Sequence, residues 1–143
     1  MKRKVAIFDV DGTIFRSSLL IELVNVLIEH KVFPEEAHLE YQREYKDWIN
    51  RQGTYEPYID GVVKVFMKYI TGADNEKVLN ATKEVLTRYE DRTYKYTRDL
   101  FKKLKDEGYY LLVISHSPKF ILEDFGKKHG FDKIYGKVCR PIT

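Results

Sequence analysis

Two aspartates separated by one residue follow the first apolar segment of this 143-residue sequence. Asp9 and Asp11 stand at the end of the run 4–10, and Gly12 and Thr13 come directly after them. Two carboxylates so close together repel one another, and Mg²⁺ suits the site because it prefers carboxylate, carbonyl and water oxygens. A surface turn with solvated acids is the alternative, but such a turn needs neither both acids nor the glycine and threonine. The pattern therefore predicts a Mg²⁺ site formed by Asp9 and Asp11.

A second polar group follows the second apolar segment, residues 109–114. Ser115 comes directly after this segment, and Ser117 and Pro118 are placed to cap and begin a helix. A small hydroxyl beside the free N–H groups of a helix N-terminus forms an anion site that suits phosphate. A simple helix cap is the alternative. Because ligands in α/β proteins bind beyond the carboxyl ends of parallel strands, we expect Ser115 to lie near Asp9.

The elements that position these residues can be read from hydrophobic periodicity and from glycine and proline. Strands are expected at 4–10, 109–114 and 133–138, and the first reads as buried on both faces because it is a continuous apolar run. Apolar residues at helical spacing predict the intervening segments to be helical. The expected helices are one at 19–31, three between Pro34 and Arg92 of which the second starts at Pro57 and the third after Asp74 or Asn75, one that ends at Gly108, and one from Pro118 to Gly130.

The order of these elements predicts an α/β fold with an inserted helical domain. Strands that alternate with helices favour a parallel sheet with right-handed crossovers. We expect residues 1–16 and 93–143 to form the α/β core. Residues 17–92, which contain no convincing strand, are expected to form an all-helical cap.

Composition excludes several classes of function. The net charge of +3 is small and its basic residues are mixed evenly with acidic ones, so no electrostatic footprint for nucleic acid is expected. No apolar run approaches the roughly 20 residues that span a bilayer, and no signal peptide is recognisable, so no membrane partner and a cytoplasmic location are predicted. The single cysteine, Cys139, cannot form an internal disulfide and is expected to be a small buried residue.

Together, the two polar groups resemble the motifs of the haloacid dehalogenase (HAD) superfamily of hydrolases. The family's first motif is a strand that ends D-x-D-G-T, as residues 9–13 do, and its second is a strand that ends in Ser or Thr, as at Ser115. The helical insertion resembles the cap of subfamily I, and residues 114–118 are similar to its phosphoserine-phosphatase-like IB branch. The resemblance implies a HAD-like Rossmannoid parallel sheet, here incomplete with about three strands, and an inserted helical cap.

The resemblance also implies roles for individual residues. Asp9 would attack the phosphoryl group of a small phosphorylated metabolite and form an aspartyl-phosphate, while Asp11 would serve as general acid and base. Mg²⁺ would be held by a carboxylate oxygen of Asp9 and the backbone carbonyl of Asp11. Ser115 and its neighbour His116 would bind the substrate phosphate. Gly12 and Thr13 would support the loop.

Two further motifs of the family are not found before Thr143: a lysine that stabilises the intermediate, and an acidic pair that completes the metal shell. Four lysines are candidates by type only, and Asp132 is a poor metal ligand because it precedes a strand. The family's sheet is also wider, with the first strand near its middle, so strand 4–10 is expected to have an unpaired edge. We expect a C-terminally truncated form, whose sheet is completed by a missing segment or by a second chain in an oligomer. The four lysines are Lys119, Lys127, Lys128 and Lys137.

Three other functions are alternatives to that of a phosphomonoester hydrolase. A catalytically inactive HAD-like module that binds phosphate or metal would keep the fold without the later motifs. A phospho-acceptor receiver would carry its acceptor aspartate on a later strand, and residues 109–115 contain none. Hydrolysis of a carbon–halogen bond would not need Asp11, because a leaving halide needs no proton. The branch that cleaves phosphoserine places a glutamate where this chain has Ser18, so phosphoserine is not favoured as the substrate.

Overall fold

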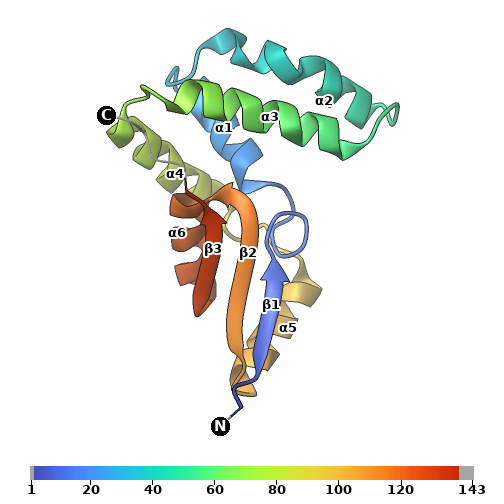
Figure 1. Cartoon of the computed structure of the whole chain (residues 1–143), viewed down its shortest axis with the longest axis vertical. Helices are drawn as coiled ribbons and strands as arrows, with labels where there is room; N and C mark the ends of the chain where they lie inside the picture. Colours follow the sequence, from blue (N-terminus) through green and yellow to red (C-terminus); the bar gives the residue numbers. More distant parts are fainter. Residues whose placement is uncertain (1, 139–143) are drawn as a thin grey trace. The chain divides into compact units, whose positions relative to one another are not determined.

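The computed structural model describes residues 2–138, which form two compact units. Unit 1 comprises residues 2–19 and 85–138, and unit 2 comprises residues 20–84. Cys139 lies outside the described residues. In chain order the elements are β1 (Val5–Asp9), α1 (Leu19–Glu29), the 3₁₀ helix η1 (Glu35–Tyr41), α2 (Gln42–Ile49), α3 (Tyr55–Ile70), α4 (Asn75–Tyr89), α5 (Lys95–Asp106), β2 (Tyr110–Pro118), α6 (Lys119–His129) and β3 (Lys133–Lys137) (Figure 1).

The sheet of unit 1 is parallel and has the order β1-β2-β3. β1 pairs with β2 from Val5 opposite Tyr110 to Asp9 opposite Ile114, and Ile114 in turn lies opposite Tyr135 of β3. The predicted α/β fold with a parallel sheet is confirmed. Among the described residues β1 pairs with β2 alone, so the expected unpaired edge is observed.

One face of this sheet is covered by helices α5 and α6, which lie behind it in Figure 1. Phe8, Leu111 and Val113 point to this face and are buried. The ring of Phe8 meets that of Phe101 on α5 edge to face, with their centroids 6.3 Å apart. The core of unit 1 therefore lies between the sheet and these two helices.

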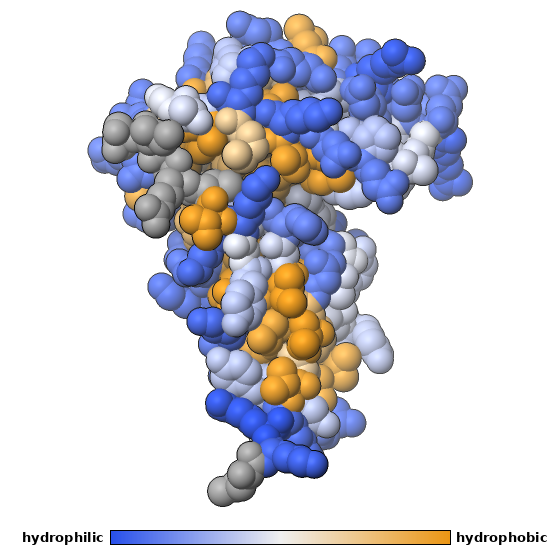
Figure 2. Space-filling view, viewed as in Figure 1, coloured by the Kyte–Doolittle hydropathy of each residue, from blue (hydrophilic) through white to orange (hydrophobic). Residues whose placement is uncertain are grey.

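The opposite face of the sheet carries apolar side chains without a covering layer in the described chain. Figure 2 shows apolar residues gathered over the front of the strands. The exposed apolar side chains of these strands include Val5, Ile7 and Ile114, with exposed fractions of 47%, 64% and 51%. The expectation that the first strand is buried on both faces is therefore wrong. An apolar run predicts that a strand can be covered on both sides, but it does not say whether a covering layer is present.

Unit 2 is helical, as predicted for the inserted segment, and α3 packs against η1 and α2. Gly61 allows η1 and α3 to lie close together. A Cβ added at this glycine would lie only 2.7 Å from the Cβ of Tyr41. The predicted start of the third helix is confirmed, since the carboxylate of Asp74 accepts a hydrogen bond from the N–H of Lys77 (3.0 Å). The second of the three predicted helices, α3, begins at Tyr55 and not at Pro57. Pro57 therefore lies in the first turn, where a proline is tolerated.

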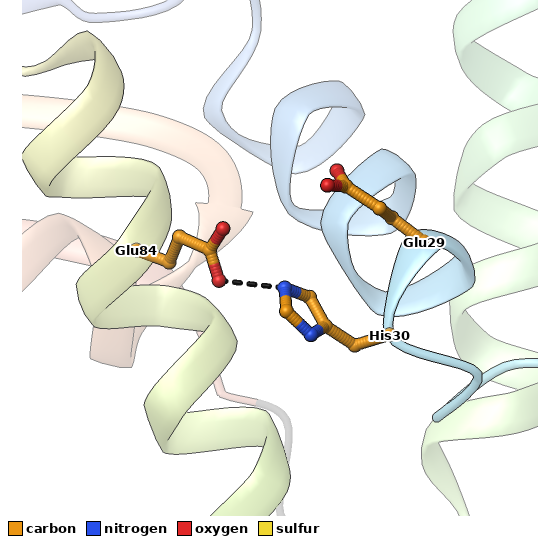
Figure 3. A group of neighbouring side chains, drawn as sticks. All are labelled: Glu29, His30 and Glu84. Carbon is orange, nitrogen blue, oxygen red and sulfur yellow. Dashed lines mark ion pairs between the residues drawn. The ribbon is translucent and has the colours of Figure 1, made fainter.

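An ion pair links the end of α1 to α4 inside unit 2 (Figure 3). Nε2 of His30 lies 2.6 Å from Oε2 of Glu84, and Glu29 lies beside them, with one ligand atom of each residue within 4.8 Å of the others. The two side chains of the pair are 49% and 31% exposed. Ion pairs this open to solvent contribute about 1 kcal/mol or less, so we assign the pair to packing of the helices.

No helix within residues 2–138 is both long enough and apolar enough to cross a lipid bilayer.

Candidate active site

The loop after β1 is a tight turn built on one buried carbonyl. The backbone N–H groups of Thr13, Ile14 and Phe15 all donate to the carbonyl of Val10, at 3.2, 2.9 and 2.9 Å. Gly12 has φ of +77°, a left-handed conformation that favours glycine. The turn therefore holds its side chains in place directly beyond the end of the strand.

Asp9 ends β1 and its side chain is exposed. The hydroxyl of Thr13 donates a hydrogen bond to Oδ2 of Asp9 (2.9 Å). Thr13 is itself tied to α5, because the hydroxyl of Thr97 donates to its carbonyl (2.8 Å). The sequence suggested only that Thr13 supports the loop, whereas the structure shows that it also orients the Asp9 carboxylate and leaves Oδ1 outside that bond.

Asp11 accepts hydrogen bonds on both carboxylate oxygens. Oδ1 accepts from the N–H of Leu19 at the start of α1 (2.8 Å), and Oδ2 accepts from the hydroxyls of Ser115 (2.6 Å) and Ser117 (3.0 Å). The N–H of Ser117 also donates to the Ser115 hydroxyl (3.0 Å). The end of β2 and the first loop, about a hundred residues apart in the chain, thus meet at this carboxylate.

The surroundings of Asp11 raise the pKa of its carboxyl on balance. Burial raises the pKa of this carboxyl, and the charge of Asp9 acts in the same direction. The hydrogen bonds from Ser115, Leu19 and Ser117 lower the pKa in part, but burial is the largest influence. A carboxyl held in this way can give a proton to a neighbouring oxygen more readily than an exposed one.

The predicted role of Ser117 as a helix cap is wrong. β2 continues to Pro118, α6 begins at Lys119, and the residue that caps α6 is Pro118, with no side-chain hydrogen bond. The hydroxyl of Ser117 binds Asp11 instead, and the residue is only 2% exposed. Alternation along a strand could have identified it, because residues two apart on a strand face the same side, as Ser115 and Ser117 do.

His116 lies between these two serines and its side chain is exposed, whereas both serines are buried. Alternation therefore directs His116 to the side of β2 opposite Asp11. Asp132 binds the β2 backbone, because its Oδ2 accepts a hydrogen bond from the N–H of Leu111 (2.8 Å).

Of the four lysines considered from the sequence, two pair with carboxylates on the surface of unit 1. Lys119 lies 3.5 Å from Glu123, and Lys128 lies 3.0 Å from Asp91. Lys127 and Lys137 are exposed. The contacts of Lys119 and Lys128 therefore lead to surface acids rather than to Asp9 or Asp11.

The oxygen donors at the end of β1 fit a hard divalent cation. The Asp9 carboxylate is exposed and has Oδ1 outside its bond with Thr13. Both carboxylate oxygens of Asp11 are already engaged, so its backbone carbonyl is the better donor from that residue. One carboxylate and one carbonyl are the donor types that Mg²⁺ prefers, usually with water in the remaining positions.

Solved structures with the same fold belong to longer proteins. The chain matches a protein of unknown function from Bordetella pertussis Tohama I (TM-score 0.72, 11% identity, 98% of this chain and 62% of that chain). It also matches a phospho-aspartyl intermediate analogue of a phosphoserine phosphatase (TM-score 0.55, 20% identity, 99% of this chain and 59% of that chain). A third match is the phosphoserine phosphatase from T. onnurineus in complex with NDSB-201 (TM-score 0.53, 18% identity, 96% of this chain and 58% of that chain). The chain thus spans about three fifths of their length.

Among curated proteins, none matches the chain at the sequence level. The family model for haloacid dehalogenase-like hydrolases matches residues 6–140. This range includes the D-x-D-G-T loop, the helical insertion and the end of β2 with its two serines. The chain therefore belongs to the haloacid dehalogenase-like hydrolase family.

Proposed function

We propose that this chain carries the nucleophile and the general acid of a Mg²⁺-dependent phosphomonoester hydrolase that works through an aspartyl-phosphate. One observation supports this most directly. The exposed carboxylate of Asp9 stands beside the partly buried carboxyl of Asp11, whose pKa is raised by burial and which accepts a hydrogen bond from Ser115. A nucleophile and a proton donor with separate environments are what the two halves of the reaction need.

The reaction proceeds in two displacements. A carboxylate oxygen of Asp9 attacks phosphorus, the bond from phosphorus to the ester oxygen breaks, and Asp11 gives its proton to the leaving oxygen. Asp11, now ionised, takes a proton from water, which attacks the aspartyl-phosphate and releases phosphate and free Asp9. Each step leaves Asp11 ready for the next, so one carboxyl serves in both directions.

The remaining residues position the phosphate and the cation. Asp9 and the carbonyl of Asp11 would hold Mg²⁺, and the ion would supply positive charge to offset the repulsion between the phosphate and the nucleophile. Ser115 donates to a phosphoryl oxygen, whereas His116, which alternation places on the other side of β2 from Asp11, is not assigned to the phosphate site. Gly12 and Thr13 keep the loop in its conformation.

The substrate class we propose is a small phosphorylated metabolite in the cytoplasm. The phosphoserine phosphatases among the structural neighbours support a phosphomonoester. The match shows only a shared fold at 18–20% identity, so it supports the class of reaction rather than phosphoserine itself.

We also propose that a further polypeptide covers the bare face of the sheet and pairs with the edge of β1. Parallel sheets are normally covered on both faces, whereas Val5, Ile7 and Ile114 are 47%, 64% and 51% exposed. A later segment of a longer chain, or a second chain in an oligomer, would supply this layer. It would also supply the lysine and the acidic pair that the described residues do not bring to Asp9.

Hydrolysis of p-nitrophenyl phosphate tests the proposed reaction. We expect turnover that requires Mg²⁺ and is abolished in Asp9→Asn, because an amide cannot act as the nucleophile. Asp106→Asn, at an exposed position of α5, is the matched control and should retain the activity. The fold should be checked by circular dichroism in both variants.

A different outcome would favour the inactive module. If the chain has no turnover but binds Mg²⁺ and beryllofluoride in calorimetry, the site binds phosphate and metal without hydrolysis. One observation favours this second function. Lys119 and Lys128 pair with surface acids, so neither is held beside Asp9, where a lysine would stabilise the intermediate.

A further inference from the structure

Ser117 has no role in the reaction as described above, yet its side chain is placed beside the proposed general acid. Its hydroxyl donates to Oδ2 of Asp11 (3.0 Å), the same oxygen that accepts the Ser115 hydroxyl (2.6 Å). Both serines are buried, at 2% and 8% exposure. The two hydroxyl donors therefore fill both lone pairs of Oδ2.

The hydrogen-bonding capacity of Ser115 shows what the second hydroxyl can do. A serine hydroxyl has one proton to donate, and Ser115 donates it to Asp11. Its oxygen also accepts the N–H of Ser117 (3.0 Å). Ser115 therefore cannot donate to a phosphoryl oxygen and to Asp11 at once, and binding of phosphate requires its hydroxyl to turn away from the carboxylate.

We propose that Ser117 is a positioning residue that retains the Asp11 carboxyl when Ser115 transfers its hydrogen bond to the phosphoryl group. This inference rests on the proposed function. After the transfer, Ser117 still holds Oδ2 and the N–H of Leu19 still holds Oδ1, so the acid keeps its orientation toward the leaving oxygen.

The backbone around Ser117 is braced for this task. β3 passes so close that a Cβ added at Gly136 would lie 3.1 Å from the carbonyl oxygen of Ser117 and 2.9 Å from Cα of Lys119. The junction of β2 and α6 is thus packed closely against β3. A hydroxyl on a fixed backbone can orient a carboxyl more precisely than one on a mobile loop.

Kinetics of p-nitrophenyl phosphate hydrolysis with Mg²⁺ distinguish this role from a structural one. In Ser117→Ala we expect kcat to fall by about tenfold or more, because a misplaced acid slows the chemical step, while KM changes little. In Ser115→Ala we expect KM to rise, because a phosphate contact is lost. Ser117→Thr keeps the hydroxyl and should restore part of kcat.

Thr82→Ala is the matched control. Thr82 is also buried, at 1% exposure, and its hydroxyl donates to the carbonyl of Val78 in unit 2 (2.9 Å). Its loss should lower the thermal unfolding midpoint without a change in kcat. An unchanged kcat in Ser117→Ala, or an equal loss in Ser117→Ala and Ser117→Thr at equal folded fractions, overturns the proposal.

A second measurement separates failure of this inference from failure of the proposed function. If the parent chain has no turnover, the proposed function fails and the catalytic role of Ser117 fails with it. The contact itself is then tested by thermal unfolding: Ser117→Ala should lower the midpoint in the parent but have little effect in Asp11→Ala. An equal shift in both backgrounds shows that the two side chains are not coupled and overturns the contact as well.

Discussion

At the scale of single residues, the site depends on how the Asp11 carboxyl is held. Burial of a carboxylate is unfavourable, and three hydrogen bonds, from Leu19, Ser115 and Ser117, offset part of that cost. The balance still raises the pKa of Asp11. The folded protein therefore binds a proton at this residue more tightly than the unfolded chain does. A general acid must carry such a proton before it can donate it.

The raised pKa predicts how stability depends on pH. In the unfolded chain an aspartate titrates at about pH 3.9. The contribution of Asp11 to stability is therefore fully present below that pH and is lost as the pH rises through the higher pKa of the folded state. Urea denaturation without Mg²⁺ from pH 4 to 8 should show the parent losing stability relative to Asp11→Asn. A difference that stays constant, or grows in favour of the parent, contradicts the assignment.

The residues of the site were predictable from sequence to different degrees. Asp9, Asp11 and Ser115 stand at or after the ends of apolar runs, so their place near the carboxyl ends of β1 and β2 could be predicted, although Ser115 lies within β2. The bonds of Thr13 to Asp9 and of Ser117 to Asp11 could not, because they depend on side-chain rotamers. The place of Ser117 on a strand was also not predicted, because β2 continues to Pro118, past the end of its apolar run.

At the scale of secondary structure elements, helix and strand positions follow closely from the sequence. Glycines mark the ends of helices, as Gly130 does for α6 with φ of +76°. Capping by Asp74 and the early proline of α3 likewise agree with the pattern. The faces of the strands were less predictable, because burial of β1 depends on which other elements cover it.

The bare face of β1 and β2 predicts that the 143-residue chain associates through it. Exposed apolar patches and unpaired strand edges promote contacts between chains. We expect the parent to bind the dye ANS or to self-associate in light-scattering chromatography, and Ile7→Lys combined with Ile114→Lys to reduce both. The same change at Leu39 and Ile49, which have similar exposure at 56% and 53%, is the control in unit 2.

Two results would count against association through this face. One is a parent chain that neither binds the dye nor associates. The other is an equal response of the two double variants, which would show that the sheet is no different from other exposed apolar residues.

At the scale of the whole molecule, the chain combines a helical unit with a parallel sheet whose loops form the candidate site. The order of elements predicts the fold class, and the D-x-D-G-T loop with Ser115 predicts the family. The exposure of the second face of the sheet could not be predicted, because the apolar pattern of a strand does not say which elements pack on it.

The most direct test of the account is to look for the aspartyl-phosphate. The protein is mixed with Mg²⁺ and a ³²P-labelled phosphomonoester, quenched in acid within milliseconds, and the label on the protein is counted. We predict label that hydroxylamine removes, as it does from an acyl phosphate, and that is missing in Asp9→Asn. A quenched protein that carries no label, or label that persists in Asp9→Asn, would contradict the account.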